Sequence, residues 1–196
     1  VGNSIGREMI IVAARASQMR KDSPQAADLV LRARALGLLE PPSFEREQRI
    51  GDLYRQVLAL EPGHVVAMLG LANTLVNEAV EYSYRFDEAT RTSKFNEAHV
   101  LAMTVKERDP RHPGPYRVIS YYARSQGDFA ASRRALEEWV SLSPKNVGAL
   151  NTLSISYISS GEPRRAIEIL ARAIDLAPRP NSWVLQMNMG RAYFMA

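Results

Sequence analysis

A repeat of 34 residues in the C-terminal half limits the possible folds of this chain more than any other feature of its sequence. When the sequence is shifted by this interval, glycines, leucines, serines and prolines fall on residues of the same kind. The matching pairs are Ser120 and Ser154, Gly127 and Gly161, Leu136 and Leu170, Leu142 and Leu176, and Pro144 and Pro178. A chain with such a period buries apolar surface between neighbouring repeats, so it needs no single central core.

The segment 147–178 encodes a helical hairpin. Apolar residues recur in two runs at the three-and-four spacing of one helical face. The first run is Leu150, Leu153, Tyr157 and Ile158, and the second is Ile167, Leu170, Ala173 and Ile174. Asn146 is placed to cap the first helix, Gly161 to end it in the left-handed region, and Pro163 to begin the second helix.

This period and this order of small and large residues resemble the tetratricopeptide repeat, a hairpin of two helices. Small residues such as Ser154, Ala166 and Ala173 stand where helices would cross closely, and large residues fill the gaps. The resemblance covers residues 65–178. It implies an all-α fold, a right-handed α-superhelix (solenoid) of helical hairpins, and it specifies no ligand.

We predict a single array of such hairpins over residues 1–196. A helix within 5–24 opens the array, and repeats follow at 25–62, 65–110, 113–144 and 147–178, with a partial repeat or capping helix at 181–196. Repeat 2 carries an insertion at about 81–94 that contains Tyr82, Tyr84 and Phe86. Long insertions in repeat proteins often lie on the binding face. Alternatively, these aromatic residues cover the edge of the neighbouring hairpin.

The composition argues against several kinds of chemical site. The chain has no cysteine, so it has neither a disulfide framework nor a thiolate metal site. His64, His99 and His112 have no ligand partner three or four residues later, and no glycine-rich phosphate loop follows a strand. We therefore predict a protein that is not an enzyme, with no catalytic residue, no metal site and no cofactor.

The net charge of +4 is mild. Arg133, Arg134, Arg164 and Arg165 begin the second helices of adjacent hairpins, so they could form a basic ladder on the convex face that contacts nucleic acid. We favour the simpler interpretation of a solvated helix surface. The apolar run from Met9 to Ala14 is too short to span a bilayer.

Two further segments resemble parts of bacterial modular regulators. One is the run from Gln25 to Leu36, followed by Pro41, Tyr54 and Leu60-Glu61-Pro62, and the other is the closing run from Trp183 to Phe194. In those proteins a helical repeat array follows a class III adenylate/guanylate cyclase domain or a winged-helix DNA-binding domain. The resemblance implies the regulatory or docking module of a larger signalling or transcription protein. Such a module is expected in the cytoplasm, or in the periplasm if the parent protein has a membrane span.

In tetratricopeptide arrays the first helix of each hairpin lines the concave face. When the repeat register is applied to the first helix of each hairpin, it predicts a peptide-binding groove formed by Asn73, Asn77, Arg117, Tyr121, Arg124, Asn151 and Ile155. The same projection turns outward Val66, Leu69, Val76, Ser125, Ile158 and Ser159. Amides and guanidinium groups suit the backbone and the carboxylates of an extended peptide. Chaperone-binding members of the family use a lysine where this chain has Leu69, so we do not expect chaperone peptides as ligands.

Three functions therefore remain open. The leading one is a protein–protein interaction scaffold that binds a peptide or partner in the concave groove. The second is a small-ligand sensor with a pocket between the insertion and the groove, and the third is nucleic-acid contact through the arginine ladder.

The last helix is apolar on more than one face. Its apolar residues are Trp183, Leu185, Met187, Met189, Tyr193 and Phe194. We predict that residues 183–194 pack against a second copy of the chain in a two-fold homodimer. Alternatively, a helix downstream in the full protein covers them.

Overall fold

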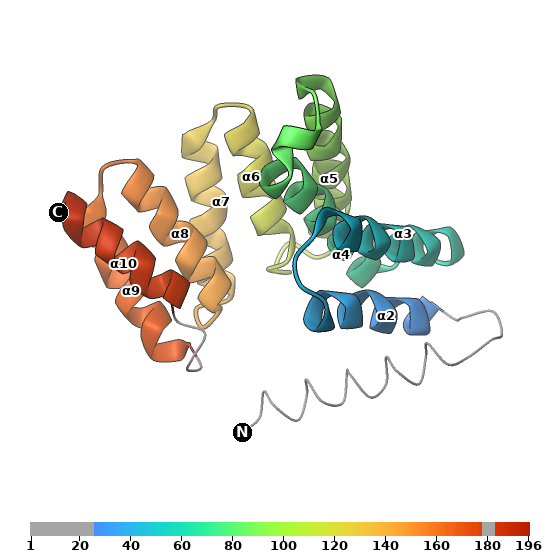
Figure 1. Cartoon of the computed structure of the whole chain (residues 1–196), viewed down its shortest axis with the longest axis horizontal. Coiled ribbons are helices and arrows are strands. Elements are labelled where there is room, and N and C mark those ends of the chain that lie inside the picture. The colour runs from blue at the N-terminus through green and yellow to red at the C-terminus, as the bar shows by residue number, and fades with distance from the viewer. Residues whose placement is uncertain (1–25, 178–182) are drawn as a thin grey trace. The chain divides into compact units, whose positions relative to one another are not determined.

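The structure, a computed structural model of the chain, describes residues 26–177 and 183–196. These residues form nine α-helices and one short 3₁₀ helix, with no β-strand among them (Figure 1). The prediction of an all-α fold is therefore confirmed. The helix predicted within 5–24 lies outside the described residues, as do residues 178–182. The chain divides into two compact units, of which the first ends at Arg108 and the second begins at Asp109.

The described residues of the N-terminal unit, 26–108, form two antiparallel hairpins. Their helices are α2 (Ala26–Leu39), α3 (Phe44–Leu60), α4 (Val65–Glu81) and α5 (Glu88–Arg108), with the 3₁₀ helix η1 (Ser83–Arg85) before α5. Helix α3 packs against both α2 and α4, so the two hairpins share one core. Val57, Leu75 and Val105 are fully buried in it, and each such side chain contributes about 1.5–3 kcal/mol of stability.

Side-chain caps define where several helices begin. Ser43 accepts a hydrogen bond from the Arg46 amide (3.1 Å) at the start of α3, and the His64 Nδ1 accepts one from the Ala67 amide (3.2 Å) at the start of α4. The Asn146 side chain accepts a hydrogen bond from the Ala149 amide (3.0 Å), as predicted. Each cap satisfies a backbone N–H that the helix leaves unpaired, which is typically worth about 1 kcal/mol.

The insertion in repeat 2 packs against the neighbouring hairpin. The ring centroids of Tyr82 and Phe86 each lie 5.6 Å from that of Phe44 on α3. The Arg85 guanidinium lies 4.7 Å from the centroid of the Phe44 ring. The second interpretation of the insertion is therefore correct for Tyr82 and Phe86, whereas Tyr84 is 76% exposed.

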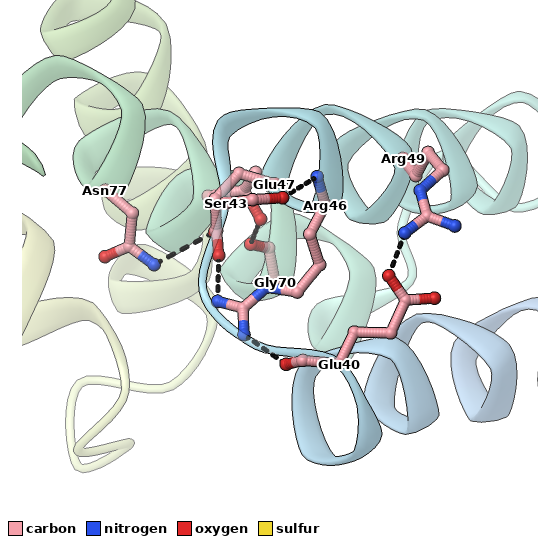
Figure 2. A network of polar contacts seen from close by, with 8 residues as sticks. Glu40, Ser43, Arg46, Glu47, Arg49, Gly70 and Asn77 are labelled. Atoms are coloured by element: carbon pink, nitrogen blue, oxygen red, sulfur yellow. Dashed lines mark hydrogen bonds and ion pairs between the residues drawn. The ribbon is translucent and has the colours of Figure 1, made fainter. Parts of the chain in front are cut away.

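A buried polar network joins α3 to α4 (Figure 2). Glu47 on α3 is only 4% exposed, and its carboxylate accepts a hydrogen bond from the Asn77 amide of α4 (3.1 Å) and pairs with Arg46. Arg46 also donates to the backbone oxygen of Glu40 (3.0 Å). Because an unpaired buried carboxylate is costly, this network favours one register of the two hairpins.

A second buried ion pair joins α4 to α5. The Lys94 Nζ lies 2.5 Å from a Glu78 carboxylate oxygen, and both side chains are largely buried. The Lys94 ammonium also lies 4.6 Å from the centroid of the Phe86 ring, so it contacts the insertion. The charged and aromatic contacts of the N-terminal unit therefore hold the insertion against both hairpins.

The C-terminal unit continues the hairpin pattern. Its helices are α6 (Pro115–Ser125), α7 (Phe129–Leu142), α8 (Val147–Ser159), α9 (Pro163–Leu176) and α10 (Trp183–Met195). Gly161 has a φ of 76° and Gly127 a φ of 78°, in the left-handed region that glycine adopts readily. Gly161 therefore ends α8 as predicted, and Pro163 occupies the first turn of α9.

Helix α10 packs on α9 and α8 through one face only. Leu185 and Ala192 are buried there, and the Asn188 amide donates to the Asn151 side-chain oxygen (2.9 Å). The opposite side is exposed and carries large apolar residues, with Trp183 at 66% and Phe194 at 93% exposure. This exposed set includes residues that the sequence pattern predicts to contact a second copy.

Two helical glycines allow the packing to be tested. A Cβ added at Gly70 would lie 2.3 Å from the Tyr54 ring, whereas one added at Gly190 would meet no atom within 4 Å. We expect Gly70→Ala to lower the free energy of unfolding by about 1–3 kcal/mol because it overpacks the core. Gly190→Ala should raise it by up to about 1 kcal/mol through helix propensity. Urea denaturation measures both, and equal stability of the two variants would contradict the close packing at Gly70.

Candidate functional site

A cleft of about 480 Å³ lies in the C-terminal unit, where α6, α7 and α8 meet. Its lining residues are Ser120, Tyr121 and Arg124 from α6, Phe129, Ser132, Arg133 and Leu136 from α7, and Thr152, Ile155, Ser156, Ser159 and Ser160 from α8 and its C-terminal end. A cleft of this volume can hold a few side chains of a peptide or a small molecule.

The walls of the cleft combine apolar surface with hydroxyl groups. Leu136 is buried behind the surface, whereas Phe129 is 68% exposed. Ser120 donates its hydroxyl proton to the backbone oxygen of Arg117 (2.7 Å), and Thr152 donates to that of Gly148 (2.8 Å). Because these hydroxyl protons already bond to the backbone, the two oxygens act as acceptors toward any other group.

The charged residues that line the cleft are two arginines, with no carboxylate among them. The Arg124 guanidinium lies 5.0 Å from the centroid of the Tyr121 ring, and that of Arg117 lies 5.1 Å from it. Within residues 109–196 the sequence has eleven Lys and Arg against seven Asp and Glu, an excess equal to the whole net charge of +4. The cleft therefore favours an anionic ligand.

Arg133 is held from two sides. It forms an ion pair with Glu162, which precedes α9, and its guanidinium lies 5.4 Å from the centroid of the Tyr157 ring on α8. Glu162 also accepts hydrogen bonds from Arg165 (2.8 Å) and Ser160 (3.1 Å). Although partial desolvation raises the pKa of the Glu162 carboxyl, the hydrogen bonds from Arg133 and Ser160 outweigh it and lower this pKa below its usual value.

The cleft brings together three of the seven predicted groove residues, Tyr121, Arg124 and Ile155. Arg117 lies beside them through its contact with Tyr121. The Asn151 oxygen accepts the hydrogen bond from Asn188 of α10. The assignment of these residues to a peptide groove stays a prediction.

The two predicted asparagines of the N-terminal unit bond within that unit. The Asn73 amide donates to the backbone oxygen of Leu69 (2.7 Å), and the Asn77 amide donates to Glu47 (3.1 Å). Both side chains are half-buried. The Asn77 side chain therefore has a structural contact that its position on the first helix does not reveal.

The sequence projection is wrong for two other residues. It turns Val76 and Ile158 outward, but they are 0% and 2% exposed. Helix α4 packs against both α3 and α5, and α8 packs against α7, α9 and α10. A helix with neighbours on several sides buries more than one stripe, so an apolar residue beside the expected stripe also enters the core.

The projection also misses the residues of α7, because it considers only the first helix of each hairpin. The sequence pattern favours a solvated helix surface for Arg133, with a convex ladder as the alternative, yet this residue lines the cleft with Phe129, Ser132 and Leu136. These four residues have the spacing of one helical face. That apolar and cationic face near the start of a second helix is the sequence signal that could have identified them.

No group of three or more His, Asp or Glu side chains within 26–177 and 183–196 is arranged to hold a metal ion. Over the same residues, none of the helices combines the length and the apolar character that a membrane span requires.

Residues 123–186, which include most of the cleft, match the tetratricopeptide repeat family. The fold is that of tetratricopeptide-repeat proteins. Among solved structures, the chain is similar to TTC0263, a thermophilic tetratricopeptide-repeat protein of Thermus thermophilus, with 16% identity, a TM-score of 0.74, and 98% of this chain and 93% of that chain covered. It is also similar to MamA 41-end from Desulfovibrio magneticus RS-1, with 16% identity, a TM-score of 0.54 and coverages of 78% and 75%.

A comparison with curated protein sequences finds no match. At 16% identity, the two structural similarities concern the fold alone.

The contact between Tyr157 and Glu137 behind the cleft gives a stability prediction. The Tyr157 hydroxyl donates to the Glu137 carboxylate (3.0 Å), and burial together with this bond raises the pKa of the Tyr157 phenol. We expect Tyr157→Phe to lower the free energy of unfolding by about 1 kcal/mol near neutral pH. Because the folded pKa exceeds the unfolded value of 10.0, the phenol's contribution is complete below pH 10 and is lost above it.

Urea denaturation at about pH 8 and at about pH 10.5 tests this, since the difference between wild type and Tyr157→Phe should shrink at the higher pH. Tyr193→Phe is the matched control, because Tyr193 is an exposed tyrosine of the same unit and the variant keeps its ring, so we expect no pH-dependent difference from wild type. A difference that stays constant with pH would contradict the assignment.

Proposed function

We propose that this chain is a protein-interaction scaffold whose α6–α8 cleft binds an extended peptide segment of a partner. Tetratricopeptide-repeat folds generally mediate protein–protein interaction. The observation that carries the proposal is the cleft, where three helices present two arginines, six serine and threonine residues and an apolar wall to one space. An extended peptide offers backbone polar groups at every residue and side chains at regular spacing, so it can use all three kinds of surface.

We also propose that this scaffold is the regulatory or docking module of a larger bacterial signalling or transcription protein. The support is the resemblance of residues 25–62 and 183–194 to such regulators. The parent gene tests this directly. An adjoining cyclase or winged-helix domain supports the proposal, and a reading frame without any effector domain contradicts it.

A small-ligand sensor is a second candidate, because a volume of about 480 Å³ also suits a small molecule. The cleft is formed by α6–α8 of the C-terminal unit, whereas the sequence pattern predicts a sensor pocket beside the insertion, which belongs to the N-terminal unit. A thermal-shift screen with metabolites distinguishes the two functions, because a ligand that binds only the folded state raises the melting temperature without any protein partner.

Nucleic-acid contact is less well supported. Arg133 and Arg165 share the carboxylate of Glu162, which reduces the charge that these two members of the ladder can offer to phosphate. Arg134 and Arg164 are exposed and retain that role in principle. Steeply salt-dependent binding to duplex DNA would favour this third function over the first two.

Charge reversal on α6 tests the peptide cleft. We expect Arg117→Glu with Arg124→Glu to weaken binding of an acidic or C-terminal peptide at least tenfold, because both guanidinium groups flank Tyr121. Folding should survive, with a loss of about 1–2 kcal/mol from the two cation–π contacts. Peptide pull-down and isothermal titration measure binding, and circular dichroism measures folding.

Arg134→Glu with Arg164→Glu is the matched control, since it makes the same change of charge at exposed positions outside the cleft lining. If the Arg117 and Arg124 variant bound every partner as the wild type does, the cleft would not be the peptide site.

We propose further that the exposed face of α10 joins two copies of the chain. The support is its large exposed apolar set, Trp183, Met187, Tyr193, Phe194 and Met195, because aromatic residues and methionine are enriched at protein interfaces. Sedimentation at several concentrations should show a dimer, and Trp183→Ser with Phe194→Ser should give a monomer that remains folded. A monomer at all concentrations, with the fluorescence of Trp183 fully open to a quencher, would refute the dimer.

A further inference from the structure

Arg133 differs from Arg124, the other arginine of the cleft, because several groups fix its position. Its ion pair with Glu162 and its place beside the Tyr157 ring come from two other elements of the fold. Its side chain is 27% exposed, whereas Arg124 is an exposed residue. A guanidinium held in this way has already lost its conformational freedom, so it loses little more when a ligand binds.

Glu162 neutralises only one of its two arginine partners. It is a single carboxylate that pairs with both Arg133 and Arg165. Part of the Arg133 side chain remains exposed in the lining of the cleft. An anion bound in the cleft can contact this exposed part and offset the remaining positive charge.

The neighbours of Arg133 indicate what the anion is attached to. Phe129 lies four residues before Arg133 on α7 and Leu136 three residues after it, and all three line the cleft. Side chains at these spacings are neighbours on a helix, with Cβ atoms about 5–6 Å apart. In an extended peptide, side chains two residues apart lie on the same face about 6.5–7 Å apart. The two spacings differ by about 1 Å, which long side chains can span, so a carboxylate and a large apolar side chain at that separation can contact Arg133 and one of its apolar neighbours together.

We propose that Arg133 is a specificity-determining residue of the cleft, which reads an Asp or Glu side chain placed two residues from a large apolar residue of the bound peptide. This inference rests on the proposed peptide-binding function and names the class of peptide. A side-chain carboxylate carries one negative charge, enough to offset one guanidinium group, whereas a phosphorylated side chain carries nearly two. Glu162 acts as the positioning residue for Arg133.

A set of synthetic peptides tests the proposal with the whole chain. Each peptide has nine residues, a blocked N-terminus and an amidated C-terminus. It carries one Leu or Phe at the centre and a single Glu that lies either one or two residues away from it. The matched peptide has Gln in place of Glu. By fluorescence polarisation, wild type should bind the peptide with Glu two residues from the apolar residue about tenfold more tightly than its Gln match, the effect of one charge-assisted hydrogen bond.

Arg133→Gln should reduce this Glu-to-Gln ratio to about one, whatever its affinity for the Gln peptide. Arg134→Gln, the adjacent and exposed arginine, should keep the ratio of the wild type. A thermal melt checks folding. If Arg133→Gln is unfolded, Arg133→Lys replaces it in the measurement, and its ratio should fall to about threefold because the charge stays and the fixed N–H geometry is lost.

The outcomes separate this inference from the proposed function. Peptide binding by wild type without a preference for Glu, or with a preference that persists in Arg133→Gln, overturns the inference and leaves the scaffold proposal standing. Tighter binding of phosphoserine peptides, or of peptides with a free C-terminus, overturns the assignment to a side-chain carboxylate. Failure of the wild type to bind any peptide overturns the proposed function and this inference together.

Discussion

The close approach of neighbouring helices at small residues is the constraint on which the rest of this structure depends. Ala67, Ala102, Ser154 and Ala173 are fully buried, and a Cβ added at Gly70 would meet the Tyr54 ring. Where a small residue allows two helices to approach, the large residues beside it interdigitate, and each hairpin buries its apolar face on the next. The cleft exists because α6, α7 and α8 are held at this spacing by the same packing.

Buried polar contacts favour one arrangement of the helices in each unit. They also occupy polar side chains that could otherwise bind a ligand. In the N-terminal unit, Glu47 takes the Asn77 amide as a partner, and in the C-terminal unit Asn151 pairs with Asn188. A buried polar group must find a partner inside the protein, so these pairs favour one register of the helices. The polar residues at the cleft, by contrast, carry an excess positive charge that an anionic ligand would neutralise.

The candidate site depends on residues that come from both helices of a hairpin. Arg124 lies on the first helix of its hairpin, whereas Arg133 lies on the second and is held by Glu162 from the following hairpin. This arrangement explains why a projection along the first helices finds Tyr121, Arg124 and Ile155 but not Arg133. Displacement of Glu162 and α9 from α7 would therefore break the ion pair that holds Arg133 at the cleft.

The sequence by itself determined the features that depend on residues within about four positions of one another. The Asn146 cap, the turn at Gly161 and the start of α9 at Pro163 all follow from local backbone chemistry. Only the tertiary structure decided that Val76 is buried, that Tyr82 and Phe86 pack on Phe44, and that Arg133 faces the cleft. Each of these outcomes depends on a contact between residues far apart in the chain, and periodicity within one helix carries no information about which neighbour will cover it.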